Sequence, residues 1–266
     1  WRGLMFDIHS HILFGVDDGS KSLEQSIEMT KISSNVGFTD IIATPHYIGN
    51  TKFNRDMTDN TRLLADLKAE TMHNNLPVRL YLGNECFLES NLVDHLKDKK
   101  VATLNDTPYI LLEVPRNKTM FSSLLNFIFE LQLNGYFVIL AHPERYDFVM
   151  NNIDTLKGLI ERDVLIQMNL PSLVGVYGHE VQNTAKKMIE HNMVHLIGSD
   201  AHNEKGYERA GKALNILKSS VSKNTFEEIT RSNPKAIVEG KILYPEAPIK
   251  IEKKKNFWQF LKFNRA

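Results

Sequence analysis

The chain has 266 residues, 42% of them hydrophobic and 24% charged, which is enough for one large soluble domain with a full apolar core. Its 32 basic residues balance 32 acidic residues, and a net charge of zero argues against nucleic-acid binding by the chain as a whole. A single cysteine, Cys86, excludes an internal disulfide and fits a reducing compartment. No secretory signal or membrane-length apolar run is visible, so we expect a cytoplasmic protein.

Short apolar runs alternate with amphipathic stretches along the chain. Seven runs rich in Ile, Val, Leu, Phe or Tyr begin near Leu4, Asp40, Val78, Pro108, Tyr136, Val164 and Val194. The stretches between them predict helices from Ser20 or Ser22 to Gly37, from Thr58 onward, and over Met120–Asn134, His179–Asn192, Tyr207–Ser219 and Thr225–Ser232. Strand alternating with helix seven times is typical of a parallel α/β protein.

Nearly every apolar run ends in a side chain that can bind a metal ion. In chain order these are His9 and His11, His46, Glu85, Glu113, His142, and Asp200 with His202, while the sixth run ends in the weaker ligands Gln167 and Asn169. In a closed barrel the carboxyl ends of the strands meet on one face, whereas an open sheet would spread six strands too widely. We therefore predict an α/β fold of the distorted seven-stranded (β/α)7 TIM-like barrel type.

This barrel is predicted to be a single domain over residues 5–246. Residues 1–4 are interpreted as a remnant ahead of a natural start at Met5. Residues 247–266 form a tail with six basic and four aromatic residues. Such a tail could contact an anionic membrane surface or a partner. The alternative is a mobile tail or a short helix packed on the barrel.

The candidate ligands occur in pairs that suit metal binding. His9 and His11 stand two apart on a strand and project from the same face, and Asp200 and His202 repeat this spacing. Asp17 or Asp18 could reach back to the site from the following loop. Ordinary core histidines and turn carboxylates would explain any single residue, but not this concentration at strand ends.

The ligand chemistry indicates a reaction class. Imidazole and carboxylate groups without thiolate suit manganese, zinc or iron. Eight or nine ligands are too many for one ion and suit two or three. Because such sites activate water and hold both oxygens of a phosphoryl transfer, they favour hydrolysis of phosphate esters.

The motifs MFDIHSHILFGVDDG, IIATPH, GNE, LLEVP, LAHPERY and IGSDAHN, in that order, resemble the polymerase-and-histidinol-phosphatase (PHP) superfamily. They are most similar to its capsule-operon branch, the CpsB/CapC-type manganese-dependent protein-tyrosine phosphatases, from about Met5 to Ile242. The resemblance implies three metals. His9, His11, Glu85 and Asp200 would hold the first metal; Asp18, His46 and His202 the second; and Glu113 and His142 the third, with Glu85 bridging.

The resemblance also implies direct attack by a metal-bound hydroxide, with Arg145 binding the phosphate. A second family arginine matches Arg209 only with a displacement of about two residues. The implied substrate is a bacterial tyrosine autokinase, associated with the membrane, that controls capsule or exopolysaccharide synthesis. A homo-oligomer is implied as well, and magnesium is a further alternative to manganese.

Other candidate catalytic or binding sites have less support in the sequence. Cys86 lacks the Cys-x5-Arg spacing of cysteine phosphatases, because Leu92 stands six residues later. Surface positions are expected for His73, His95, His179 and His191, and a structural role for His195. No glycine-rich phosphate loop occurs. Two alternatives to a phosphotyrosine phosphatase are a small-molecule phosphatase of the histidinol-phosphatase type and a non-catalytic, metal-stabilised binding module.

Overall fold

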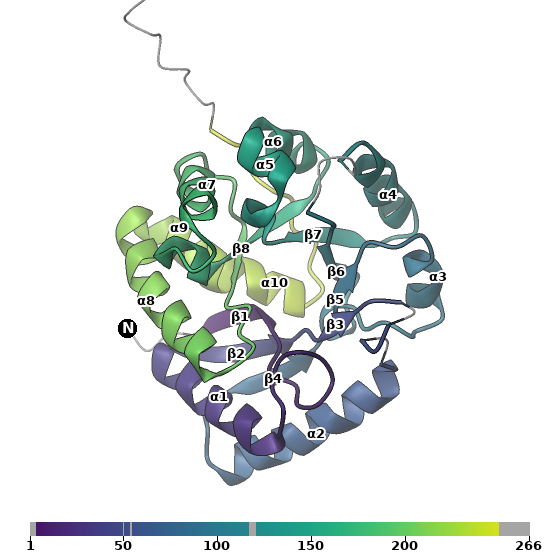
Figure 1. The fold of residues 1–266 in the computed structure, drawn as a ribbon, viewed down its shortest axis with the longest axis vertical. Coiled ribbons are helices and arrows are strands. Elements are labelled where there is room, and N and C mark those ends of the chain that lie inside the picture. The colour runs from purple at the N-terminus through teal and green to yellow at the C-terminus, as the bar shows by residue number, and fades with distance from the viewer. Residues whose placement is uncertain (1–3, 50, 54, 117–120, 250–266) are drawn as a thin grey trace, which may run out of the picture.

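The computed structural model describes residues 4–49, 51–53, 55–116 and 121–249. They form a mixed α/β fold with a curled parallel sheet surrounded by helices (Figure 1). The strands are β1 (Met5–Ser10), β2 (Phe38–Ala43), β3 (His46–Tyr47), β4 (Arg79–Leu82), β5 (Glu85–Phe87), β6 (Tyr109–Glu113), β7 (Phe137–Ala141), β8 (Leu165–Asn169) and β9 (Leu196–Gly198). The N-terminal residues 1–3 and the tail from residue 250 onward lie outside the described residues, so the predicted roles of both segments stay predictions.

Two of the seven predicted strands are each split into two pieces. One ladder has the order β1-β2-β4 and the other the order β3-β5-β6-β7-β8-β9, all parallel. The break between β2 and β3 contains Pro45, which has no N–H to donate to a ladder. Bonds from Gly83 N to Ala43 O (2.9 Å) and from Glu85 N to Pro45 O (3.1 Å) carry the pairing across the gap. The splits thus bend the sheet without separating its halves.

The first and last strands lie next to each other. Ser10 and Ala201 form an isolated parallel bridge. On either side of it, His11 N donates to Ala201 O at 3.1 Å and Asp200 N donates to His9 O at 2.8 Å. This contact between β1 and β9, called the seam below, places the first predicted ligands, His9 and His11, beside Asp200.

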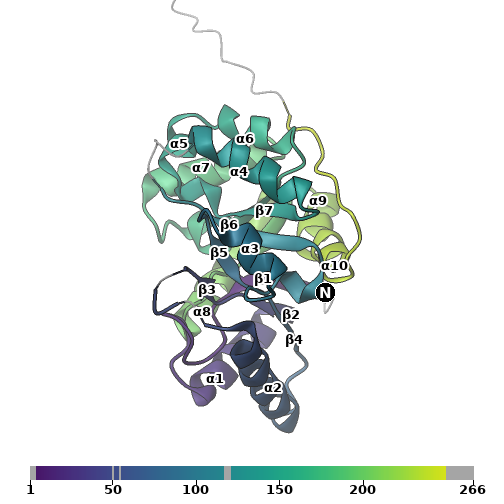
Figure 2. The ribbon, with the colours of Figure 1, turned by 90° about the vertical axis from the view of Figure 1, so that its right-hand side faces the viewer.

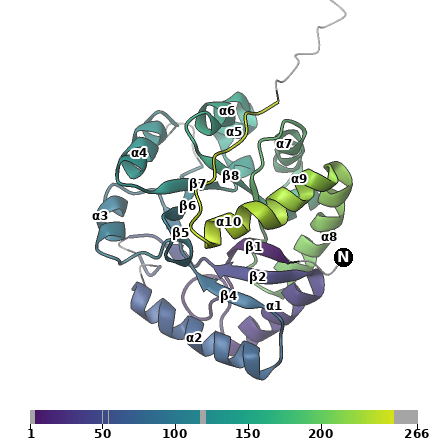
Figure 3. The same cartoon turned by 180° about the vertical axis from the view of Figure 1, so that it is seen from behind.

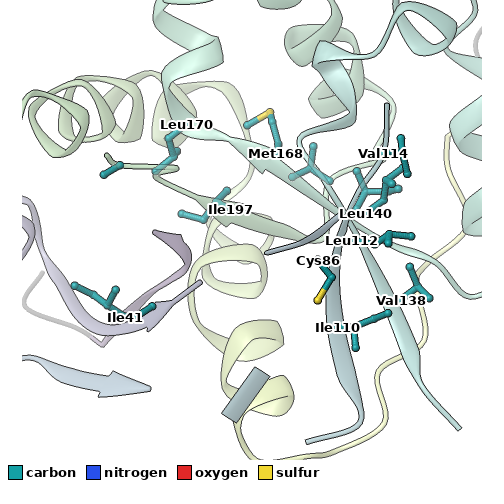
Figure 4. Packing of buried hydrophobic residues seen from close by; sticks show 14 of the residues in the cluster. Ile41, Cys86, Ile110, Leu112, Val114, Val138, Leu140, Met168, Leu170 and Ile197 are labelled. Carbon is teal, nitrogen blue, oxygen red and sulfur yellow. The ribbon is translucent and has the colours of Figure 1, made fainter. Parts of the chain in front are cut away.

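Successive side chains of a strand point to opposite faces of the sheet, so the buried apolar residues form an inner and an outer cluster. On β6, Tyr109 and Leu111 pack in the inner cluster, whereas Ile110 and Leu112 pack outward with Cys86 and Leu140 (Figure 4). Because side chains alternate across a strand, Glu113 follows Leu111 on the inner side. The strand pattern therefore directs this carboxylate to the interior at the carboxyl end of the sheet.

The outer layer consists of the helices α1 (Leu23–Val36), α2 (Met57–His73), α3 (Leu92–Lys97), α4 (Phe121–Leu133), α5 (Asp147–Asn151), α6 (Asp154–Ile160), α7 (His179–Glu190), α8 (Glu204–Ser220) and α9 (Lys223–Glu227). In the side view, α1 and α2 lie at one end and α4 to α7 at the other (Figure 2). None of the helices in the described part of the chain has the length and apolar character needed to span a bilayer.

The predicted helix ends are largely reproduced. Ser22 caps α1 by accepting from Gln25 N, and Gly37 ends it with φ 113°. α8 begins three residues earlier than predicted because Asn203 caps it through Gly206 N. α3, α5 and α6 were not predicted, and they are all seven residues or shorter.

The far end of the sheet is closed by the C-terminal part of the chain. α10 (Asn233–Val238) lies across it in the view from behind (Figure 3). After α10, Tyr109 Oη donates to Lys241 O at 2.9 Å and accepts from Leu243 N at 2.7 Å. This segment therefore covers part of the amino-terminal end of the strands, opposite the end that carries the predicted ligands.

Candidate metal centre

All nine predicted ligands converge at the carboxyl ends of the strands. They are His9 on β1, His11 and Asp18 just after it, His46 on β3, Glu85 on β5, Glu113 on β6, His142 after β7, and Asp200 and His202 after β9. Each belongs to at least one group whose potential ligand atoms lie within 4.8 Å of one another. Residues separated by up to 193 positions thus share one site.

Four atoms surround one point at the seam. His9 Nε2 and His11 Nε2 are 3.3 Å apart, and each lies 3.3 Å from Glu85 Oε2. Asp200 Oδ1 lies 3.5 Å from His9 Nε2 and 3.3 Å from His11 Nε2. Ligand atoms bound to one ion at about 2.0–2.2 Å are roughly 3–3.6 Å apart. The spacing therefore fits a common metal ion.

Two further groups flank this point. Asp18 Oδ1 lies 3.5 Å from His46 Nε2 and 3.4 Å from His202 Nε2. On the other side, His142 Nε2 lies 2.8 Å from Glu85 Oε1 and 3.9 Å from Glu113 Oε1. Glu85 thus directs one oxygen to each of two groups. The groups differ from the implied sets. His11 also falls with Asp18, while Glu85 falls with His9 and His142 in one group and with His46 and Glu113 in another.

The outer nitrogen of three histidines is held by a partner atom that is not one of the clustered ligand atoms. His11 Nδ1 lies 2.7 Å from Asp17 Oδ2, His9 Nδ1 lies 3.0 Å from Gln167 Oε1, and His202 Nδ1 lies 3.0 Å from Asp200 O. Partners of this kind fix the ring orientation of metal-ligating histidines. They leave Nε2 of each ring directed into the cluster.

Several buried ligand atoms of the cluster lack a hydrogen-bond partner among the described residues, and bound cations would satisfy them. His46 Nδ1 and Glu85 Oε2 are 3.0 Å apart, yet neither buried atom makes a well-formed hydrogen bond, and the same is true of His142 Nδ1. Burial opposes the charged form of His9, but Glu85 and Asp200 outweigh it and raise its pKa to about 9. The residues present fit a site for divalent cations, because carboxylates and imidazoles bind them together.

Two of the ligands have strained backbones. His142 has φ 33° and Asp200 has φ 49°, in the left-handed region that residues other than glycine rarely adopt. Such strain persists only where surrounding contacts impose it, and it concentrates at functional sites. Here it turns both side chains toward the cluster directly after β7 and β9.

The cluster forms the floor of a cavity of about 340 Å³ that also contains three arginines, Arg116, Arg145 and Arg209. Arg145 Nη1 donates to Asp200 Oδ2 at 3.0 Å. A larger cavity of about 1110 Å³ lies at the opposite end of the sheet, near Phe6 and Thr39, and contains none of the predicted ligands. The smaller cavity is therefore where cations and an anionic group can meet.

Further polar and aromatic residues lie around the cluster beyond the predicted ligands. Asp17 holds His11 and also accepts from His46 N at 3.0 Å, a role that the sequence left open between Asp17 and Asp18. Asp7 is fully buried and binds Ser199 across the seam. It shares the strand face of His9 and His11, and this spacing was the available signal. Tyr177 and Arg116 had no such signal, because they lie in loops.

The remaining histidines and Cys86 lie apart from the cluster. His195 is buried, and its Nδ1 accepts from Ile166 N at 3.0 Å, in keeping with a structural position. His95 is not the surface residue that was predicted, because its Nδ1 lies 3.0 Å from Tyr47 Oη in a half-buried setting. His73 and His179 are exposed, and His191 is half-buried. Cys86 is fully buried, and burial raises the pKa of its thiol.

Comparison with known proteins assigns the chain to a family. A family model described as "Capsular polysaccharide synthesis, CpsB/CapC" matches residues 5–239. CapC of Staphylococcus aureus is 37% identical over 198 residues, covering 74% of this chain and 77% of its own. The tyrosine-protein phosphatase YwqE of Bacillus subtilis is 30% identical over 259 residues, covering 96% of this chain and 100% of its own.

Solved structures agree with this result. A structure from a study of YwqE of Bacillus subtilis and CpsB of Streptococcus pneumoniae, described as metal-dependent tyrosine phosphatases, superimposes with a TM-score of 0.81 at 28% identity. It covers 94% of this chain and 100% of the other. The phosphotriesterase homology protein of Escherichia coli shares the fold alone, with a TM-score of 0.53 at 13% identity, covering 86% of this chain and 97% of the other. The chain is therefore a member of the CpsB/CapC family.

Proposed function

We propose that the chain is a metal-dependent protein-tyrosine phosphatase that hydrolyses phosphotyrosine on a protein. The observation that carries the proposal is the convergence of four histidine and carboxylate atoms, 3.3–3.5 Å apart, beneath a cavity that holds Arg145. The names of its relatives YwqE and CpsB support phosphotyrosine as the group that is hydrolysed.

The proposed metal ligands are the nine clustered residues, with manganese as the favoured ion and zinc, iron or magnesium as alternatives. Following the resemblance and the contact distances, His9, His11, Glu85 and Asp200 would hold one ion, Asp18, His46 and His202 a second, and Glu113, His142 and Glu85 a third. When bound, such ions polarise phosphoryl oxygens and lower the pKa of water.

The chain's own residues would bind and orient the substrate. Arg145 can donate two parallel hydrogen bonds to a phosphoryl group, and its bond to Asp200 aims it at the cavity. Arg209 lines the same cavity and is proposed as a second phosphate contact. A phenolate leaving group has a pKa of about 10, so its departure needs little protonation by the protein.

The wider setting is also part of the proposal. We take residues 5–246 as one catalytic unit and treat the two ladders as a single distorted seven-stranded barrel, which the bridge between Ser10 and Ala201 supports. The proposed substrate is a membrane-associated bacterial tyrosine autokinase of capsule or exopolysaccharide synthesis. A cytoplasmic location and a homo-oligomeric state complete the proposal.

Phosphate release from a phosphotyrosine peptide, with Mn²⁺ and with EDTA, tests the reaction. We expect release that requires the ion and that is lost in the His9→Ala/His11→Ala double variant. Histidinol phosphate, assayed in parallel, distinguishes the small-molecule alternative, since preferential turnover of that compound would contradict the proposal. Ion-dependent thermal stabilisation without turnover of either compound would instead indicate a binding module.

A further inference from the structure

Tyr177 lies beside Arg145 in the turn that precedes α7. Its ring centroid is 4.4 Å from the guanidinium carbon, which is within the range of a cation–π contact. Its hydroxyl is 3.5 Å from Asp200 Oδ2, the same oxygen that accepts from Arg145 Nη1 at 3.0 Å and from Asn169 Nδ2 at 2.6 Å. Arg145 is therefore held by a carboxylate and by an aromatic ring.

Tyr177 lies between two cavities, so its contact with Arg145 bears on which of them the guanidinium occupies. Tyr177, Arg145 and Arg116 line both the 340 Å³ cavity above the cluster and an outer groove of about 440 Å³. Met150 and His179 line only the outer groove. The guanidinium could therefore also occupy the outer groove, away from the cluster, if nothing kept it on the cavity side.

Removing the ring would release this constraint. The Arg145 side chain is 16% exposed, and within the described residues its ion pair is with Asp200, whose other oxygen faces His9 and His11. A long side chain held at one point loses more conformational freedom when it binds an anion than one that is already ordered. A leucine at position 177 would still fill part of the wall between the two spaces, but it would supply no ring face to Arg145.

We propose that Tyr177 is a positioning residue that holds Arg145 in its phosphate-binding orientation through the face of its ring. The inference rests on the proposed phosphatase function only for the identity of the substrate. The binding of phosphate at Arg145 can be measured without turnover. The ring is the required element, because the hydroxyl contact of 3.5 Å is at the outer limit of a hydrogen bond.

The test compares Tyr177→Phe with Tyr177→Leu in the metal-loaded protein. Affinity for inorganic phosphate is measured by calorimetry, and KM and kcat are measured on a phosphotyrosine peptide. We expect Tyr177→Phe to remain within about twofold of the wild type, and Tyr177→Leu to weaken phosphate binding and raise KM by about fivefold, with a smaller change in kcat. The midpoint of metal binding is expected to stay unchanged in both variants.

Three outcomes would overturn the inference. Equal losses in the two variants would assign the effect to the hydroxyl instead of the ring. Unchanged phosphate affinity in Tyr177→Leu would remove the positioning role, and so would a weaker affinity that merely follows a loss of bound metal. If the wild type binds phosphate with the expected dependence on position 177 yet hydrolyses no phosphotyrosine, the proposed function fails and the positioning role stands.

Discussion

Asp7 on β1 binds Ser199 across the seam between the first and last strands. Its Oδ1 accepts from Ser199 N at 2.8 Å, and its Oδ2 accepts from Ser199 Oγ at 2.6 Å. Ser199 Oγ in turn accepts from Ala201 N at 3.1 Å. Because the backbone ladder at this seam is only a single bridge, these side-chain bonds fix His9 and His11 relative to Asp200.

Replacing Asp7 should therefore damage both stability and the metal centre. Asp7→Ala leaves the Ser199 N–H buried without an acceptor and is expected to lower the free energy of unfolding by about 3 kcal/mol. Asp7→Asn keeps one acceptor oxygen and should lose less. Urea denaturation measures whether stability falls from the wild type to Asp7→Asn and further to Asp7→Ala. An Asp7→Ala variant as stable as the wild type would contradict this prediction.

Gly198, the last residue of β9, should not tolerate a side chain. A Cβ at this position would lie 2.6 Å from His9 Cβ and 2.7 Å from Gln167 Nε2. Gly198→Ala must push His9 out of place, so we expect a loss of about 1–3 kcal/mol and weaker binding of metal.

Gly158 on α6 provides the matched control. A Cβ there meets only Arg162 Nη1, at 3.7 Å, and Gly→Ala in a helix is favourable by up to about 1 kcal/mol. Thermal unfolding with and without Mn²⁺ measures how much stability and metal binding each of the two variants loses. Equal behaviour of Gly198→Ala and Gly158→Ala would show that the space beside His9 is not restricted.

How far the sequence predicted this arrangement depends on the residue. The alternation of strands and helices and the ligands at strand ends were readable, because strand-end position is encoded locally by apolar runs and the polar residues that follow. The splits at Pro45 and Gly83 and the seam contact between Asp7 and Ser199 were not. Pro45 and the spacing of Asp7 from His9 are local signals, but they do not identify the partner. That partner is set by contacts between segments far apart in the chain.

His195 should make stability depend on pH between about 4 and 6.5. Burial lowers its pKa from 6.5 to about 4. Above pH 6.5 the ring is neutral in both states, and below this pH the unfolded chain takes up a proton that the folded protein excludes. At about 1.4 kcal/mol per unit, acidification to pH 4 should remove roughly 3 kcal/mol of stability.

The comparison variant is His195→Asn, whose side-chain oxygen can replace Nδ1 as the acceptor for Ile166 N. This variant has no titrating group at position 195, so its stability should fall less steeply on acidification than that of the wild type. Denaturation curves collected from pH 7 to pH 4 give the difference. Parallel pH profiles would mean that His195 does not titrate differently in the two states.

Cys86 should be dispensable for the reaction. It is fully buried among apolar residues, and burial raises the pKa of its thiol, so little thiolate is available as a nucleophile. We expect Cys86→Ala to retain phosphate release within about threefold of the wild type while losing about 1 kcal/mol of stability. Iodoacetamide should leave the activity of the native protein intact. Rapid inactivation by iodoacetamide, absent in Cys86→Ala, would instead indicate chemistry at the thiol.

The clustered residues are proposed to bind the ions with which the chain hydrolyses phosphotyrosine. The most direct test titrates metal-depleted protein with Mn²⁺ and measures bound metal and phosphate release from a phosphotyrosine peptide in the same samples. Glu85→Gln removes a carboxylate charge that contacts both His46 and His142. Glu89→Gln on the same segment is the control, since among the described residues Glu89 accepts from Gly49 N and lies near His95.

We predict that release rises with occupancy to two or three ions per chain in the wild type and in Glu89→Gln, and that Glu85→Gln loses both bound metal and release. Full occupancy without release, or release that persists without metal, would contradict the account.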